Sequence, residues 1–320
     1  MNKKGFTLIE LMIVVAIAGF VILAGYQFYI DVFQFQVNQE QQSDMQMRLQ
    51  SAMDILVSDI RAAGFGTVDP RELQWKTPLE KSLIPFNTVL PVIAKNGNAG
   101  PDAITISGAK QFVGTLAAVA DPFAAPNMTV NPPAGAGTPQ LINVGDIITI
   151  GGFYSSAVIA MGNPINLAPS AKKGKNIEIY PIGTPVYRVE SMVYNIGPSG
   201  IPAASDLALL MTPAGGGASI VIATGIEDLQ VGYQLNNMVA GGPNVVNAPA
   251  AAVGGVQPFL SIRVSLVARR ADRNPNYQGG MTLALEDNPA KVVADGFKRA
   301  ILTRVVELPN DGCGIIHRVC

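Results

Sequence analysis

The chain opens with an apolar segment long enough to cross a membrane as a helix. Within residues 11–30 the only ionisable side chains are Tyr26 and Tyr29, and Gln27 is the one strongly polar residue. A membrane-crossing helix needs about 20 predominantly apolar residues. This pattern predicts a transmembrane helix at the amino terminus.

Charges flanking the apolar segment predict its orientation. Lys3 and Lys4 precede it, and no basic residue follows it until Arg48. Positive residues tend to stay on the cytoplasmic side, so we expect a cytoplasmic amino terminus. A cleavable signal peptide is the alternative, with Ala16 and Ala18 as small residues near a cut. The hydrophobicity continues unbroken through residues 20–23, which favours the membrane helix.

The next segment predicts that the helix continues beyond the membrane. Residues 31–63 contain no Pro and no Gly, whereas Gly64 and Gly66 supply a natural carboxy-terminal stop. Apolar residues recur at helical spacing and mark one face, which a sheet is expected to cover. This stripe consists of Met45, Leu49, Met53, Leu56 and Ile60.

After Gly66 the pattern changes to alternating apolar and polar residues, which is typical of antiparallel strands with one solvated face. The predicted strands are residues 103–107, 146–150, 177–181, 186–193, 207–211, 220–223, 229–235, 260–266, 281–285 and 301–308. Stretches rich in Ala, Gly and Pro predict long loops at residues 124–138, 213–218 and 241–255. Helical periodicity returns only weakly, at residues 291–298.

Charge gives little reason to expect a nucleic-acid binder. The 320-residue chain has a net charge of −1, and removing Lys3 and Lys4 takes it to −3. Arg269, Arg270 and Arg273 form one small basic cluster. We interpret it as a solvated turn, with a DNA-binding or partner-binding patch as the alternative.

The residue inventory disfavours an enzyme. His317 is the only histidine, which excludes a His-dependent triad with a distant Ser and any His-rich metal site. No phosphate-binding glycine motif with Lys-Ser/Thr occurs. Asp272, Asn274 and Asn276 lack the remainder of a calcium loop and fit an ordinary turn better. We therefore expect no cofactor and no bound metal.

Residues 5–10, Gly-Phe-Thr-Leu-Ile-Glu, resemble the processing site of type IV prepilins and pseudopilins. The resemblance implies cleavage between Gly5 and Phe6 by a prepilin peptidase, followed by N-methylation of Phe6. The new amine would lie one helical turn before Glu10, where residues four apart face each other. Neutralisation would make this carboxylate tolerable in an apolar setting. The alternative is that Glu10 only reaches the lipid headgroups.

Three further segments, residues 59–65, 225–233 and 260–270, resemble the PilW family of minor type IV pilins. This resemblance implies an α+β fold in which a long, half-transmembrane helix packs on an antiparallel sheet with long loops. It divides the chain into a leader at 1–5, an assembly helix at 6–30, its amphipathic continuation at 31–63 and a β-rich head at 64–320.

The same resemblance implies a minor pilin that is processed at the bacterial inner membrane and later reaches the pilus or cell surface. Its expected partners are other minor pilins, the major pilin, the peptidase and the inner-membrane assembly platform. A type II secretion pseudopilin and a tip-displayed adhesin or DNA-uptake pilin are the alternatives.

Cys313 and Cys320 are the only cysteines, and the head is expected in an oxidising compartment, where two cysteines usually pair. Pilins are also known for carboxy-terminal disulfide loops, which supports this pairing. A zinc site formed by Cys313, His317 and Cys320 is the weaker alternative because no fourth ligand is evident. Free thiols and pairing with another chain also stay open.

The processing hypothesis predicts the effect of one substitution. Gly5→Val should give a full-length protein that inserts into the membrane but is not trimmed, because a peptidase needs close access to the backbone there. Mass spectrometry of the wild-type mature protein should find methylated Phe6 at its amino terminus. A mature chain beginning after Ala18 would instead support an ordinary signal peptide.

Overall fold

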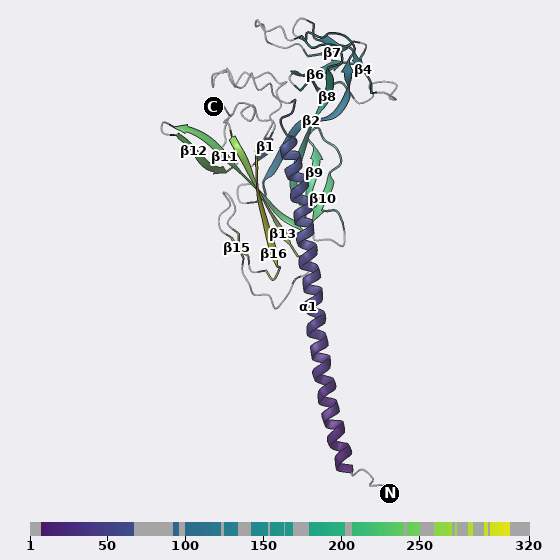
Figure 1. Cartoon of the computed structure of the whole chain (residues 1–320), viewed down its shortest axis with the longest axis vertical. Helices are drawn as coiled ribbons and strands as arrows, with labels where there is room; N and C mark the ends of the chain where they lie inside the picture. The colour runs from purple at the N-terminus through teal and green to yellow at the C-terminus, as the bar shows by residue number, and fades with distance from the viewer. Residues whose placement is uncertain are drawn as a thin grey trace. The chain divides into compact units, whose positions relative to one another are not determined.

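The computed structural model describes residues 8–66, 92–95, 100–122, 125–133, 142–152, 154–162, 164–168, 179–201, 207–239, 242–249, 259–270, 273, 281–283, 291–293 and 295–307. Within these ranges one α-helix is followed by strands (Figure 1). The chain divides into two compact units, residues 1–47 and 48–320. The helix α1, Leu8–Ala62, begins in the first unit and ends in the second.

The second unit contains a ten-stranded sheet in which every described pairing is antiparallel. Its main path runs β1-β2-β8-β5-β6-β7-β3, while β4 pairs with β2 and β9 joins β8 to β10. Its strands are β1 Val92–Lys95, β2 Ala103–Leu116, β3 Asn127–Met128, β4 Val130–Asn131, β5 Ile147–Ile150, β6 Tyr154–Ala160, β7 Ile165–Leu167, β8 Pro185–Pro198, β9 Leu207–Pro213 and β10 Ile220–Thr224.

A second, four-stranded antiparallel sheet has the order β12-β11-β13-β16. Its strands are β11 Ile226–Val239, β12 Gly242–Pro249, β13 Phe259–Arg269 and β16 Arg299–Glu307. Two short strands, β14 Met281–Leu283 and β15 Lys291–Val293, pair only with each other among the described residues. This arrangement confirms the predicted α+β fold with an antiparallel sheet.

The predicted apolar stripe of the helix is buried. Met45 is 9% exposed, Leu49 is 3% exposed, and Met53, Leu56 and Ile60 are fully buried. Complete burial of one such side chain contributes roughly 1.5–3 kcal/mol. The stripe is therefore a major source of the attachment between the end of α1 and the head.

Glycines allow a close approach where the helix ends. Gly64 and Gly66 both have positive φ angles, 86° and 69°, as the predicted stop requires. The Gly64 amide donates to the Ser107 carbonyl of β2. Two residues farther along β2, the Ala109 amide donates to the Phe65 carbonyl. At Gly108, between these contacts, a Cβ atom would lie 2.9 Å from the Ala62 carbonyl oxygen.

A polar group reinforces the same contact. The Tyr194 hydroxyl on β8 donates to the Asp59 carboxylate of α1, which also forms an ion pair of 2.8 Å with Lys110 of β2. Burial, assisted by the bond to Asp59, raises the pKa of Tyr194 well above its usual range. Farther back along the helix, Asp54 pairs with Arg304 of β16 at 2.6 Å.

The structure corrects two secondary-structure predictions. Residues 291–293 form strand β15 rather than the predicted helix, because pairing with β14 overrides the weak periodicity. The predicted loop at 241–255 is wrong for β12, which pairs with β11 over eight register positions. The Gly and Pro residues that indicated a loop lie at the ends of that strand, Gly242, Pro243 and Pro249.

Within the described ranges, other elements also differ from the predicted ones. The three longest, β2, β8 and β11, have 14 residues each. The predicted 124–138 loop contains the two-residue strands β3 and β4. The predicted 281–285 strand is found as β14 over Met281–Leu283, and its last two residues lie outside the described ranges. Of the predicted strand at 177–181, the described part contributes a single bridge from Tyr180 to Ala120.

The glycine contact yields a test of the helix attachment. Gly108→Val should lower the unfolding free energy of the mature protein in detergent by about 1–3 kcal/mol, because its side chain would collide with the helix backbone. Thermal unfolding followed by circular dichroism measures this effect. Gly215→Val is the control because nothing lies within 4 Å of that position. Equal melting temperatures for the two variants would contradict the close-contact argument.

Candidate functional site

The structure places one of the predicted amino-terminal site residues. Glu10 lies exposed in the first turn of α1. Gly5 and Phe6 lie outside the described residues, as do Cys313 and Cys320. Cleavage, methylation and the disulfide therefore stay predictions.

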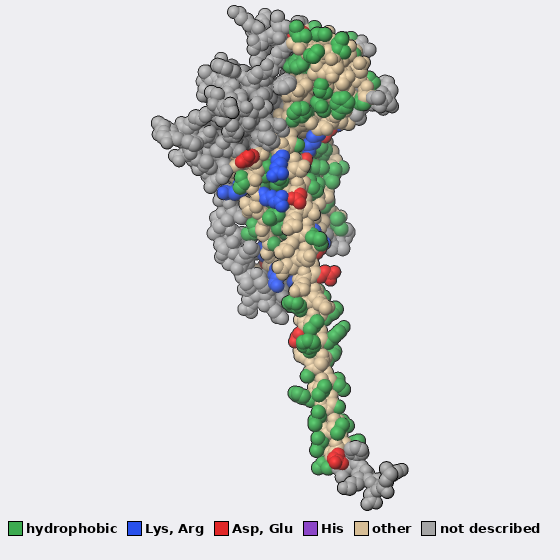
Figure 2. All heavy atoms as spheres, viewed as in Figure 1, with side chains coloured by type: hydrophobic (Ala, Val, Ile, Leu, Met, Phe, Trp, Pro, Cys, Tyr) green, Lys and Arg blue, Asp and Glu red, His purple; other side chains and the backbone are tan. Residues whose placement is uncertain are grey.

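Within the first unit, exposed apolar side chains occur along most of the helix, and Figure 2 shows those of one face. They include consecutive as well as helically spaced positions, so they do not form a single stripe. The large exposed ones are Leu8, Ile9, Leu11, Met12, Ile13, Val14, Val15, Ile17, Phe20, Val21, Ile22, Leu23, Tyr26, Phe28, Tyr29, Val32, Phe33, Phe35 and Met47.

A helix that is apolar on every side needs lipid or other helices around it. Among the described residues α1 is the one helix with the length and composition to cross a membrane. None of its most apolar segment is buried. This segment is the candidate surface for membrane insertion and for assembly with other helices.

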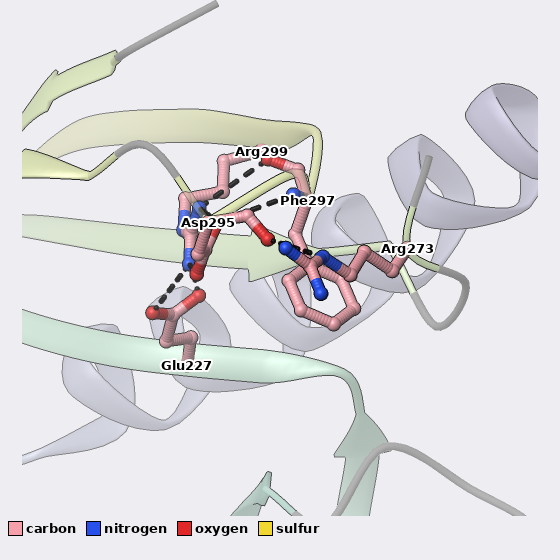
Figure 3. Close-up of polar contacts among 5 residues, drawn as sticks. All are labelled: Glu227, Arg273, Asp295, Phe297 and Arg299. Atoms are coloured by element: carbon pink, nitrogen blue, oxygen red, sulfur yellow. Dashed lines mark hydrogen bonds and ion pairs between the residues drawn. The ribbon is translucent and has the colours of Figure 1, made fainter. Parts of the chain in front are cut away.

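A cluster of charged side chains lies in the head, where β13 separates strands β11 and β16 (Figure 3). Arg299 of β16, with its side chain 1% exposed, donates to both oxygens of Glu227 on β11 at 2.8 and 3.1 Å. It also donates to the two oxygens of Asp295 at 2.8 and 2.6 Å. Two carboxylates thus compensate one buried guanidinium, which is necessary for a buried charge.

The electrostatics of this cluster follow from its hydrogen bonds. Donation by Arg299, followed in importance by the Phe297 amide, holds the pKa of Asp295 well below its usual range against the opposing effect of burial. The same bonds to Asp295 and Glu227 raise the pKa of Arg299 despite desolvation. These shifts keep Asp295 and Arg299 charged at neutral pH, and the cluster that they form with Glu227 is an ion-pair network with a structural role.

The basic cluster noted in the sequence surrounds this network. The Arg269 guanidinium lies 4.6 Å from the centre of the Phe297 ring, a cation–π distance. The Arg270 amide donates to the Lys298 carbonyl, and Arg273 Nε donates to the Asp295 carbonyl at 3.0 Å. Arg269 and Arg270 are half-buried, so the expectation of a solvated turn is wrong for them. The contacts favour a structural role over a basic binding patch.

A buried carboxylate joins the two sheets near the start of β2. Asp102 is 2% exposed, and its carboxylate accepts the Val231 amide of β11 at 2.9 Å. Its own amide donates to the Leu229 carbonyl. Gln230 between them donates to Asp228 at 2.8 Å and to the Gly100 carbonyl at 3.0 Å. The acidic segment 225–233 is thus an anchor between the sheets.

Sequence reasoning missed the partners in these clusters. Asp295 and Arg299 are about 70 residues from Glu227, and no spacing rule in one sequence connects them. Asp102 carried no signal beyond its position beside a strand. Among the residues that the structure describes, no group of three or more His, Cys, Asp or Glu is placed to hold a metal ion.

Comparisons with known proteins agree with the resemblance seen in the sequence. Residues 1–26 match the prokaryotic N-terminal methylation motif, and residues 194–310 match type IV pilus-assembly protein W. The second match includes β11, β13, β16 and the Arg299 network. These matches confirm the predicted resemblance to prepilins and to the PilW family, which are structural proteins rather than enzymes.

Among solved structures, the chain is similar to a type IV-like pilin from Thermus thermophilus, with 12% sequence identity and a TM-score of 0.37. The alignment covers 83% of this chain and 96% of that one. The search of curated proteins gave no match.

The Arg299 network predicts an acid-dependent contribution to stability. Because the folded pKa of Asp295 is below the unfolded value of about 3.9, its contribution is present above that pH and is lost as the pH falls toward the folded pKa. Asp295→Asn should lower the melting temperature at pH 7 by roughly 2–4 °C, allowing for solvent screening of this partly exposed group.

The difference in melting temperature between the Asn variant and the wild type should narrow below about pH 4, where the Asp295 carboxylate of the unfolded wild-type chain begins to protonate and the charged folded form loses its advantage. Differential scanning calorimetry over a pH series measures it. Glu307→Gln is the control, because it removes one exposed carboxylate at the other end of β16. A melting-temperature difference between Asp295→Asn and the wild type that is constant with pH would contradict the charge-based explanation.

Proposed function

We propose that this chain is a minor type IV pilin that is processed at the inner membrane and takes part in starting the pilus or forming its tip. The observation that carries the proposal is the combination of two features in one chain. A prepilin-type amino terminus leads into a helix that is apolar on all sides, and the same helix ends in a head whose PilW match spans residues 194–310.

In this proposal the first unit changes its surroundings from lipid to protein. The exposed apolar side chains of α1 suit both environments, because neither requires a polar face. Glu10 is the exception, since a carboxylate in an apolar environment must be compensated. Cleavage after Gly5 would create an amine at Phe6, and pairing with Glu10, within one chain or between neighbours, would favour the assembled state.

The head supports a subunit that is present in few copies. Subunits repeated along a helical fibre must leave lateral room for their neighbours at every step. The head of residues 64–320 combines a ten-stranded and a four-stranded sheet, and a head of this size meets no such restriction at the leading end. The proposed partners are therefore other minor pilins and the major pilin, with the prepilin peptidase and the assembly platform acting before incorporation.

The alternatives differ in what the same architecture serves. A type II secretion pseudopilin would share the helix, and a tip-displayed adhesin or DNA-uptake pilin would use the head loops. DNA uptake is the less favoured of these, because the described basic residues Arg269, Arg273 and Arg299 contact groups of the head itself. The neighbouring genes would separate a minor pilin from a secretion pseudopilin, because the first is expected beside other pilus minor-subunit genes and the second beside secretion genes.

The role of Glu10 can be tested by substitution. Glu10→Val should leave membrane insertion intact, because it removes a charge from the apolar segment. Incorporation into fibres should be lost, because the Phe6 amine would have no partner in an environment of low dielectric constant. Fractionation should find the variant in the inner membrane and not in sheared fibres. Normal incorporation would show that Glu10 has no part in assembly.

Deletion of the gene tests the proposed function as a whole. The number of fibres per cell should fall, while their diameter stays that of the wild type. Quantitative mass spectrometry of sheared wild-type fibres should find this chain far below the main subunit. A dominant share of the fibre, with regular labelling along the shaft, would contradict the assignment as a minor pilin.

A further inference from the structure

The outer edge of β16 is a long, regular strand edge. This strand pairs with β13 over nine consecutive positions, from Arg299 opposite Arg269 to Glu307 opposite Ser261, without a bulge. No described strand pairs with its other side. Half of the backbone groups of an edge strand point away from its one partner, so this edge offers a row of donors and acceptors.

The other described edges carry features that hinder pairing. The β12 edge contains Pro243 and Pro249, and β10 has only five residues with a register irregularity after Val221. The β1 edge has four residues and ends in Lys95, while β3 and β4 have two residues each. Short length, proline, lysine and bulges are the means by which proteins protect sheet edges. Among the described edges, β16 is the one that is both long and without these features.

The side chains of β16 do not replace this protection. Residues 300–303 and the pair Val305 and Val306 are uncharged. Arg304, the charge between them, is directed to Asp54 of α1 at 2.6 Å. Val306 is almost completely buried, whereas Val305, whose side chain points to the opposite face of the sheet, is 52% exposed. An apolar β-branched side chain thus stands exposed on an unprotected edge.

We propose that the β16 edge receives an extended strand from the head of a neighbouring fibre subunit, which continues the four-stranded sheet. An extended backbone is the partner that satisfies such an edge, because its amides and carbonyls repeat with the same spacing. A strand with an apolar residue beside Val305 would also cover that side chain. The neighbour is identified as another minor pilin on the basis of the proposed function, in which such subunits assemble together at the start or tip of the fibre.

The position of the edge in the head fits this role. The start of β16 is fixed by the buried Arg299, and farther along the strand the exposed pair of Arg304 with Asp54 lies against α1. These contacts involve side chains and leave the outer backbone groups of the strand unused in the described structure. A strand held in this way is preorganised, which reduces the entropy cost of pairing.

Site-specific photocrosslinking in cells tests the proposal with the full chain. A benzophenone amino acid placed at Thr303, which is exposed in the middle of β16, should crosslink to another prepilin-type subunit. Peptide mapping should place the crosslink in a predicted strand of that subunit. The control position is Ile159, which is as exposed as Val305 at 53% but lies on β6, between β5 and β7. An adduct no stronger at Thr303 than at Ile159 would overturn the proposal.

Two substitutions test whether strand pairing causes the crosslink. Val305→Pro removes an amide and should reduce the Thr303 adduct at least tenfold. Val305→Lys is the milder variant, in case proline disturbs pairing with β13, and should also weaken the adduct. Ile159→Lys should leave it unchanged. An adduct that persists in a folded Val305→Lys protein, as judged by its melting temperature, would contradict pairing at this edge.

Fibre counts separate this proposal from the proposed function. If gene deletion lowers the number of fibres but folded Val305→Lys protein restores it to the wild-type number, the edge proposal is wrong and the minor-pilin function stands. If deletion of the gene leaves the fibre number unchanged, the proposed function is wrong, and the edge proposal, which rests on it, is wrong with it. A count restored by Ile159→Lys but not by Val305→Lys supports both.

Discussion

The head is organised by the burial of one face of the last four turns of α1. Leu49, Met53, Leu56 and Ile60 are all nearly or completely inaccessible to solvent, and small residues at Ala52 and Ala63 accompany them. The contact is close enough that Gly108 of β2 has no room for a side chain beside the helix backbone. Close packing of this kind is sensitive to single methylene groups. It fixes the position at which the helix meets the sheet.

Polar contacts add direction to this apolar attachment. Asp59 contacts both β2 and β8, Asp54 contacts β16, and Arg48 donates to Thr224 of β10. Exposed pairs such as Asp54 and Arg304 contribute little energy individually. Buried groups are different. A buried carboxylate such as that of Asp102 destabilises the fold unless a hydrogen-bond donor, here the Val231 amide, lies opposite it. These contacts therefore favour one register of the helix and of the two sheets over others.

The two parts of α1 obey different physical requirements, although they belong to one helix. Its second part is apolar on one face and has the head to cover that face. Its first part is apolar all around and has exposed side chains at nearly every position, which only lipid or other helices can cover. The same reasoning applies on a smaller scale to β16, whose outer backbone groups pair with no strand that the structure describes. In each case the exposed feature indicates what kind of neighbour the chain requires.

The sequence alone determined the features that depend on local pattern. The apolar segment, the Met45–Ile60 stripe, the glycine stop and the strands around β11 and β13 follow from periodicity and turn chemistry, which nearby residues set. The prepilin-type motif was likewise readable because its residues are contiguous. Only the tertiary structure decided that 242–249 is a strand, since the partner β11 supplies the hydrogen bonds that its Gly and Pro content did not suggest. The pairing of Glu227 with Arg299 and of Asp59 with Tyr194 also required the fold, because contacts between residues 72 and 135 positions apart leave no trace in local spacing.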